Sequence, residues 1–207
     1  MRIVFATGNK DKMREIREIL GGIGAEILSM KEAGVFEDVV EDGSSFAENA
    51  RIKADAIYKI LAEKDPEEAE NTVVLADDSG LEIDHLNGEP GIYSARYLGK
   101  DTPYTEKNRI IIERLAGAEG DERSARFVCA IAAALPGGKK LDTVGKMEGR
   151  ICFEIAGENG FGYDPIFFLP EYGKTSAEIS PEEKNAISHR GKALRAMADL
   201  LVESFNE

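Results

Sequence analysis

The chain has 207 residues, of which 43% are hydrophobic and 31% are charged, and its formal net charge is -13. This length and composition fit one globular domain, or one domain folded in two lobes, with a substantial apolar core. The negative charge argues against nucleic acid as a partner, because that binding depends on Lys and Arg neutralising phosphates. No apolar run approaches the roughly 18 residues of a membrane-spanning helix, so we expect no membrane partner.

The N-terminal residues and the cysteines indicate a cytoplasmic protein. Met1 and Arg2 lead directly into a short strand-like segment, so we expect no signal peptide. Cys129 and Cys152 lie in apolar segments without metal-ligand spacing. We interpret them as small core residues of a protein from a reducing compartment.

The first apolar segment, residues 3–6, predicts a strand, and residues 10–20 predict a helix after a glycine-containing turn at residues 7–9. Such a turn directs backbone N–H groups and the positive helix end into one small space, which attracts phosphate. Lys12 continues the apolar stripe of the helix, so its ammonium can reach that space. An ordinary cap, with Asn9 as the N-cap and Lys12 lying along the surface, is the alternative.

A helix over residues 46–64 carries the most informative lysine of the N-terminal half. A short strand at residues 26–28 and an acidic loop containing Glu41 precede this helix, which opens with a capping-box pattern. Lys53 lies on its apolar stripe. Either the side chain extends past the core to solvent, or it faces a cleft that contains negative charge. We favour the cleft.

Residues 73–81 read VVLADDSGL. The apolar run predicts a strand buried on both faces, with Asp77 and Asp78 at its end and a second strand at residues 81–83. A carboxylate at the edge of an apolar core must be paired, hydrogen-bonded or bound to a cation. Strand ends in α/β sheets commonly bind ligands, but a turn built from the same polar side chains is an equal alternative.

The second half of the chain predicts further strands and a glycine-rich loop. Residues 65–71 are expected to form an acidic linker, and residues 125–135 and 141–153 a hairpin. In the loop at residues 157–165 the glycine spacing does not fit a dinucleotide-binding turn. A base could stack on Phe161 while Asp164 or peptide groups read its edge, although a loop with packed aromatics explains the pattern without a ligand.

A single C-terminal helix is expected from Ser180, its N-cap, through an apolar stripe that ends at Phe205. Lys184, His189 and Arg190 gather hydrogen-bond donors in its first turns, where several could meet an anion. On a regular helix His189 lies roughly 140 degrees from Lys184. Simple solvent exposure of His189 is therefore the alternative.

These polar residues divide into donors and cations, carboxylates and an aromatic loop. An anionic chain with local cations beside carboxylates suggests a nucleoside triphosphate bound through Mg²⁺, because carboxylate and phosphate oxygens share that ion. Hydrolysis would then need a water activated by a carboxylate or by the metal.

Segments in order along the whole chain resemble the inosine triphosphate pyrophosphatase family, which hydrolyses non-standard purine nucleoside triphosphates. They are TGNKDK at 7–12, ENARIKA at 48–54, LADDSGL at 75–81, PGIYSARY at 90–97, FGYDP at 161–165 and EKNAISHRG at 183–191. Any one of these segments is a weak signal, but their order makes a chance resemblance improbable.

The resemblance implies an α/β fold in which residues 1–207 form a single two-lobed domain, with an elongated mixed β-sheet and flanking helices around a central cleft, usually as a homodimer. It implies Mg²⁺-dependent hydrolysis of ITP, dITP and XTP to the monophosphate and pyrophosphate. Asp78 takes the general-base and metal position, Glu41 the other metal position, and Ser79 is a ligand contact. The triphosphate cradle corresponds to Thr7, Gly8, Asn9, Lys10, Asp11, Lys12 and Lys53, and the base pocket to Phe161, Gly162, Tyr163, Asp164, Lys184, His189 and Arg190.

Two other functions stay open on the sequence. One is a pyrophosphatase for modified pyrimidine nucleotides, and the other is a non-catalytic nucleotide sensor. The carboxylates argue against the sensor, because binding alone does not require a base beside the metal. Asp77 is expected to orient or support the site rather than to act in it.

Overall fold

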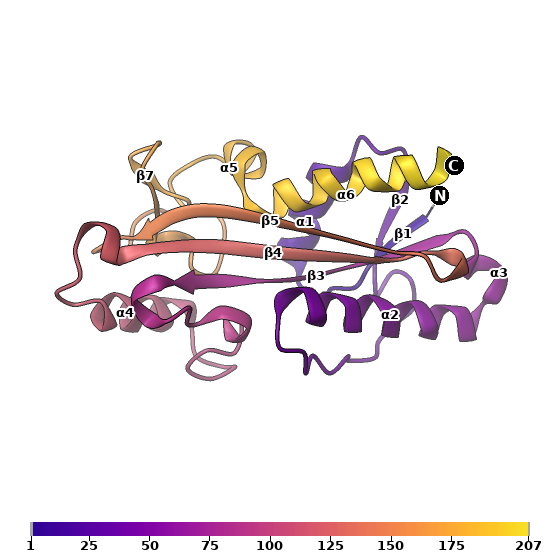
Figure 1. Ribbon diagram of the computed structural model, residues 1–207, viewed down its shortest axis with the longest axis horizontal. Coiled ribbons are helices and arrows are strands. Elements are labelled where there is room, and N and C mark those ends of the chain that lie inside the picture. Colours follow the sequence, from indigo (N-terminus) through magenta and orange to yellow (C-terminus); the bar gives the residue numbers. More distant parts are fainter. Residues whose placement is uncertain (1, 207) are drawn as a thin grey trace. The chain divides into compact units, whose positions relative to one another are not determined.

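The computed structural model describes residues 2–206, which form a seven-stranded sheet in the order β2-β1-β3-β4-β5-β6-β7 (Figure 1). β1 pairs in parallel with β2 and β3, and β6 pairs antiparallel with β5 and β7, so the sheet is mixed as predicted. The strands are β1 (Arg2–Phe5), β2 (Glu26–Ser29), β3 (Thr72–Ile83), β4 (Ser124–Ala134), β5 (Lys140–Ile151), β6 (Phe167–Leu169) and β7 (Lys174–Thr175).

Helices connect and cover these strands. Those of the described residues are α1 (Lys10–Leu20), α2 (Phe46–Lys64), α3 (Pro66–Ala69), α4 (Tyr104–Arg114), α5 (Pro181–Ile187) and α6 (His189–Asn206). The predicted linker at residues 65–71 is wrong, because Asp65 accepts a hydrogen bond from the Glu68 N–H and Pro66 occupies the first turn of α3. Asp65 and Pro66 are themselves helix-start signals. No helix among residues 2–206 is long and apolar enough to cross a membrane.

The described chain divides into two compact units. Unit 1 consists of the residues up to Asp78, Cys129–Gly145 and the residues from Arg190 onward, and unit 2 consists of Ser79–Val128 and Lys146–His189. Each unit has its own apolar core. The strands β3, β4 and β5 each contribute residues to both units.

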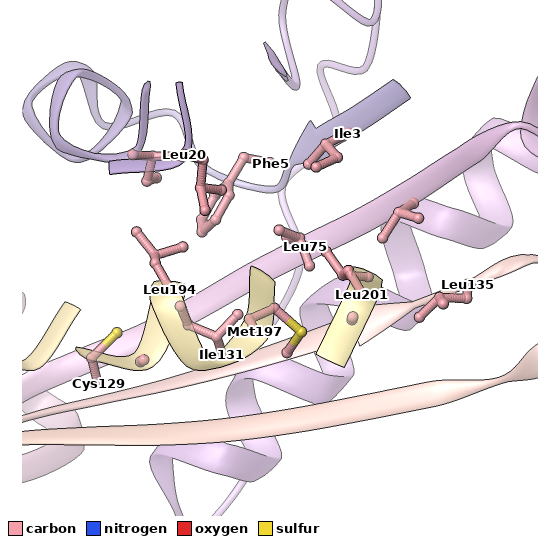
Figure 2. Packing of buried hydrophobic residues seen from close by; sticks show 14 of the residues in the cluster. Ile3, Phe5, Leu20, Leu75, Cys129, Ile131, Leu135, Leu194, Met197 and Leu201 are labelled. Carbon is pink, nitrogen blue, oxygen red and sulfur yellow. The ribbon is translucent and has the colours of Figure 1, made fainter. Parts of the chain in front are cut away.

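In unit 1, α1 and α6 pack on one face of the sheet. Phe5, Leu75, Ile131 and Leu194 point into this core (Figure 2). The helix α2 covers the opposite face, and its buried apolar residues are Phe46, Ala50, Ala54, Ile57 and Leu61. Because side chains alternate along a strand, β3 supplies odd-numbered residues to the first face and even-numbered residues to the second.

In unit 2, α4 packs its apolar side against the other half of the long strands. Ile111 and Leu115 join Leu81 and Ile83 of β3 in a fully buried core. Pro103 precedes α4, a position at which proline is common. This core carries the loop at residues 157–165 between β5 and β6.

Candidate active site

The strand β3 continues through both carboxylates, which corrects the prediction of a strand end or a turn at Asp77 and Asp78. The parallel strand β1 ends beside Leu75. The Leu75 carbonyl accepts from the Ala6 N–H at 2.7 Å, and the Asp77 carbonyl, two residues on, points the same way beyond the end of β1. There it accepts a hydrogen bond from Lys53 Nζ at 3.0 Å. The two carboxylates therefore lie where β3 extends beyond the end of β1.

The connections of β1 explain why polar groups gather here. β1 lies between β2 and β3. The helix α1 precedes β2 and the helix α2 precedes β3, and these two helices lie on opposite faces of the sheet. In α/β sheets such a reversal marks the usual ligand site, outside the carboxyl ends of the central parallel strands. The turn at residues 7–9 follows β1 directly and so belongs to this place.

The turn at residues 7–9 caps α1. Asn9 Oδ1 accepts from the N–H groups of Asp11 at 2.9 Å and Lys12 at 3.1 Å, and Thr7 Oγ1 accepts from the Asn9 N–H at 3.2 Å. The cap predicted as the alternative is therefore present. Because Asn9 already binds these amides, a phosphate here would rely more on lysine ammonium groups than on the helix end.

A pocket of about 950 Å³ lies beside α1. Thr7, Gly8 and Lys10 line it, and Gly8 and Lys10 are exposed. Arg14 and Arg17 also line it. The first residues of the expected triphosphate cradle thus border open space, as a binding role requires.

Asp77 is fully buried on the face covered by α1 and α6. Lys12 Nζ lies 3.0 Å and an Arg190 guanidinium nitrogen 3.1 Å from its Oδ2, and Arg190 also donates to Glu15 at 2.5 Å. Burial alone would raise the pKa of Asp77, but the charges of Lys12, Arg190 and Lys53 outweigh it and hold that pKa well below its usual range. We refer to Lys12, Glu15, Asp77 and Arg190 as the Asp77 cluster.

This cluster gives Arg190 a place that the sequence did not predict. Its side chain is only 2% exposed and binds two carboxylates of unit 1. The charge of Asp77 accordingly raises the pKa of Arg190 against the effect of burial. Its expected contact with a base stays a prediction.

Asp78 points to the opposite face, toward α2. Asn49 Nδ2 donates to its Oδ2 at 2.9 Å. Burial raises the pKa of Asp78, and the Glu41 carboxylate raises it further, against the opposing effects of Asn49 and Lys53. Lys53 Nζ lies 3.1 Å from Glu41 Oε1. Lys53 therefore faces negative charge, as we favoured from the sequence, rather than extending freely into solvent.

The loop that carries Glu41 packs on the start of α2. The Gly43 N–H donates to Asn49 Oδ1 at 2.9 Å. A Cβ at position 43 would lie 2.7 Å from Glu48 Cβ and 2.8 Å from Asn49 Oδ1, closer than side chains tolerate. Asn49 thus links this loop to Asp78 through its two amide atoms.

The donor set at Asp78 and Glu41 fits a small divalent cation. Both side chains offer carboxylate oxygens, and the Glu41 carboxylate is close enough to Asp78 to raise its pKa, although the Lys53 ammonium opposes this effect. Among residues 2–206, no three or more His, Cys, Asp or Glu side chains are grouped so that they could hold a metal ion. One or two carboxylates suffice for Mg²⁺ when phosphate and water oxygens complete its coordination.

The glycine-rich loop of unit 2 is organised by Asp164, which is buried. Its Oδ2 accepts from the Phe161 N–H at 2.8 Å and from Lys184 Nζ at 2.7 Å, while its Oδ1 accepts from Ser176 Oγ at 2.8 Å. Lys184 Nζ also lies 5.0 Å from the centre of the Phe161 ring. Since both carboxylate oxygens are bonded, peptide groups are better placed than Asp164 to read a base.

The single C-terminal helix predicted from Ser180 is wrong. α5 ends at Ile187 and α6 begins at His189, because Ser188 is extended with φ -64° and ψ 154°. His189 is buried and its ring stacks on Phe127 with centroids 4.9 Å apart. The exposure considered for His189 is therefore also wrong, since the angle from Lys184 applies only to an unbroken helix.

Comparisons with known proteins agree with this geometry over nearly the whole chain. The sequence model of the Ham1 family matches residues 3–200. The chain belongs to the Ham1 family. A dITP/XTP pyrophosphatase of Clostridium perfringens is 48% identical over 200 residues, which are 97% of this chain and 97% of that protein.

Two solved structures are similar to this Ham1-family chain. A HAM1 protein from Coxiella burnetii is 41% identical, with a TM-score of 0.84 over 98% of this chain and 99% of that one. The Ham1 protein of Staphylococcus aureus is 38% identical, with a TM-score of 0.84 over 99% of this chain and 100% of that one. The resemblance stated from the sequence motifs and the predicted α/β fold are both confirmed.

The sequence reasoning missed several residues that position the site of this family member. Glu15 lies three residues after Lys12 on the buried side of α1, and that spacing could have identified it. Asn49 of α2 is another such residue, and it is 1% exposed. Ser176 gave no sequence signal, because its bond to Asp164 depends on the path of the loop.

The segment at residues 90–97 also has a structural role. Ser94 Oγ accepts from the Leu81 N–H at 2.9 Å, and the Ser94 carbonyl accepts from the Tyr163 hydroxyl at 2.7 Å. Ser94 thereby connects β3 to the glycine-rich loop within unit 2. Arg96 is exposed and lies over the Tyr93 ring.

Proposed function

We propose that this chain hydrolyses non-standard purine nucleoside triphosphates, namely ITP, dITP and XTP, to the nucleoside monophosphate and pyrophosphate. The observation that carries the proposal is the pair of carboxylates, Asp78 and Glu41, beside the Lys53 ammonium in a chain of the Ham1 family. The Clostridium perfringens relative is a dITP/XTP pyrophosphatase. A carboxylate for water activation and cations for phosphate are the groups that this hydrolysis needs.

The chain's own residues divide the reaction between them. A water oxygen attacks the α-phosphorus, the bond from that phosphorus to the bridging oxygen breaks, and pyrophosphate leaves. Asp78 accepts a proton of the attacking water. Lys12 and Lys53 stabilise the negative charge that develops on the leaving pyrophosphate. Asp77, held between Lys12 and Arg190, fixes the Lys12 ammonium rather than taking part in proton transfer.

Mg²⁺ is the cation that we propose for Asp78 and Glu41. When bound, it would add positive charge at the phosphate oxygens and help orient the triphosphate. Lys53 contacts Glu41 directly, so this ammonium would shift toward the phosphates as the cation binds. Ser79 follows Asp78 on β3 and remains a proposed ligand contact.

For the base we propose the loop of unit 2. Phe161 offers a stacking face, and Lys184 lies under the same ring. Peptide groups of Gly162 and Tyr163 would read the purine edge, and His189, whose ring stacks on Phe127, remains a proposed member of the base pocket. A 6-keto purine is then preferred because adenine would leave these polar groups mispaired.

A pyrophosphate-release assay with ITP, XTP, dITP, ATP and dUTP tests the proposal. We expect Mg²⁺-dependent release from the first three at rates well above those from ATP and dUTP. Preference for dUTP or another pyrimidine triphosphate would replace the proposal with the pyrimidine alternative. Tight binding of ITP without release of pyrophosphate would replace it with the nucleotide sensor.

The assembly and the location are also proposals. We propose a homodimer in the cytoplasm, on the basis of the resemblance and of the two reduced cysteines. Sedimentation equilibrium of the purified protein tests the first, and fractionation of the source cells tests the second.

A further inference from the structure

The helix α4 buries two polar side chains beside the glycine-rich loop. Lys107 is 1% exposed and Asn108 is 2% exposed, whereas Glu106 and Arg109 of the same helix are exposed and paired with each other. Burial of polar groups costs free energy unless they are hydrogen-bonded. These two positions therefore require a reason that an amphipathic helix alone does not supply.

Asn108 forms a hydrogen bond through only one of the two polar atoms of its side chain. Its Nδ2 donates to the Gly162 carbonyl at 3.1 Å, while its Oδ1 is buried without a hydrogen-bond partner in the described structure. An apolar side chain of similar shape would avoid the cost of that unpaired oxygen. The bond that Asn108 donates to Gly162 is thus the feature that explains an asparagine here.

The Gly162 carbonyl lies in the middle of a tight turn. Gly162 has φ 68°, Tyr163 has φ -92° and ψ 3°, and the Asp164 N–H donates to the Phe161 carbonyl at 3.3 Å. In a four-residue turn the central peptide can rotate about its flanking bonds, which changes where its N–H and C=O point. A donor from outside the turn that holds this carbonyl fixes the orientation of the whole peptide.

The neighbours of Asn108 on α4 support the same turn through its aromatic ring. Tyr104 contacts Tyr163 edge to face, with ring centroids 5.1 Å apart. Lys107 Nζ lies 4.9 Å from the Tyr104 ring and donates to the Ala95 carbonyl at 2.9 Å. Tyr104 and Asn108, at spacing i and i+4 on one helix face, therefore brace the loop from α4, and Lys107 packs on the Tyr104 ring.

We infer that Asn108 is a positioning residue for base discrimination, because it fixes the peptide between Gly162 and Tyr163. The inference rests on the proposed function, in which this turn presents the Phe161 ring and the peptide groups to the base. Asp164 holds the turn from inside and Asn108 holds it from α4. Recognition of a base edge requires placement within about 0.5 Å, so loss of the brace lowers discrimination more than turnover.

The test compares Asn108→Leu and Asn108→Asp with the matched control Arg109→Gln on the exposed side of α4. Leucine keeps the branching at Cγ and removes the unpaired oxygen, whereas aspartate keeps the shape and places an acceptor against the carbonyl. For each variant we measure kcat and KM with ITP and ATP, the thermal unfolding midpoint, and amide hydrogen exchange of residues 161–164 without nucleotide.

Both Asn108 variants should lower the ratio of kcat/KM for ITP over ATP by roughly fivefold, which is the value of one neutral hydrogen bond. The change should lie mainly in KM for ITP, with faster exchange at residues 161–164 and no fall in the unfolding midpoint of Asn108→Leu. The control should match the wild type.

An unchanged ITP to ATP ratio in both variants overturns the inference, and so does unchanged exchange at residues 161–164. A lower unfolding midpoint with an unchanged ratio assigns Asn108 a structural role only and overturns it as well. Failure of the wild type to release pyrophosphate from ITP contradicts the proposed function instead, and the exchange measurement then still decides whether Asn108 fixes the turn.

Discussion

Asp77 and Asp78 are consecutive on β3, yet their carboxylates lie on opposite faces of the sheet. Asp77 is enclosed by Lys12 and Arg190 on the side of α1 and α6, and Asp78 is bonded to Asn49 on the side of α2. The alternation of a continuous strand causes this separation. Equal chemical changes at the two positions should therefore have different effects.

Asp78→Asn should remove catalysis and leave binding. We expect kcat for ITP to fall by at least about 100-fold, because the amide cannot accept the proton of the water. The affinity for ITP, measured by calorimetry, should stay within a few fold of the wild type. Turnover near the wild-type level would contradict the role of Asp78.

Asp77→Asn should act mainly on stability. It leaves the partly buried Lys12 and the buried Arg190 without their shared carboxylate, which should lower the free energy of unfolding by roughly 3 kcal/mol. Urea denaturation at neutral pH measures the loss. If Asp77→Asn is as stable as Asp78→Asn, the Asp77 cluster does not support unit 1 as described.

Gly43→Ala should weaken the site without touching its carboxylates. The added methyl group would collide with Glu48 and Asn49, so the loop must move and carry Glu41 with it. We expect the Mg²⁺ concentration for half-maximal activity to rise by about tenfold, because the displaced Glu41 would bind the cation in a poorer geometry. Gly22→Ala is the matched control, because a Cβ there meets open space. Equal Mg²⁺ requirements in the two variants would refute the packing argument.

Glu32 should titrate far below an ordinary glutamate. The Ser29 hydroxyl and N–H bind its carboxylate, and with Arg17 they lower the pKa of Glu32 to about 2. A lowered folded-state pKa means that its contribution to stability is present above the unfolded value near 4.5 and is lost as the pH falls toward 2. Carbon-detected NMR of the carboxyl group checks this. A midpoint above pH 4 would show that these bonds are absent in solution.

The two thiols should differ in reactivity. Burial raises the pKa of Cys129 to about 12, and its side chain is fully enclosed, while Cys152 is partly exposed. Because the thiolate is the reactive form, iodoacetamide at pH 8 should leave Cys129 unmodified in the folded protein and modify it in urea. Mass spectrometry of the peptides measures both sites, and rapid native labelling of Cys129 would contradict the packing of unit 1.

Local sequence signals predicted the helices that begin with an N-cap side chain. Asn9 begins α1 and Ser45 begins α2 with side-chain bonds to backbone N–H groups within three residues. The apolar stripe of α2 also identified Lys53 as a charged residue at an apolar position, and the structure places its ammonium beside Glu41. For the two caps the physical cause lies within one helical turn of the residue.

Other features could not be predicted because their causes are distant in sequence. Asp, Ser and Gly have low strand propensity, yet β3 continues through them in the interior of the seven-stranded sheet. The break between α5 and α6 occurs at Ser188, where the sequence has neither proline nor glycine. The place of Arg190 depends on Glu15, which no local pattern connects to it.

The bond between Arg190 and Glu15 spans 175 positions of the chain, and the bond between Arg190 and Asp77 spans 113. During translation at about 5–20 residues per second, Asp77 precedes Arg190 by on the order of ten seconds. All of unit 2 is synthesised in that interval. The nascent chain therefore carries an incompletely neutralised Asp77 until α6 begins to emerge, and unit 1 completes its core only after the ribosome has passed residue 190.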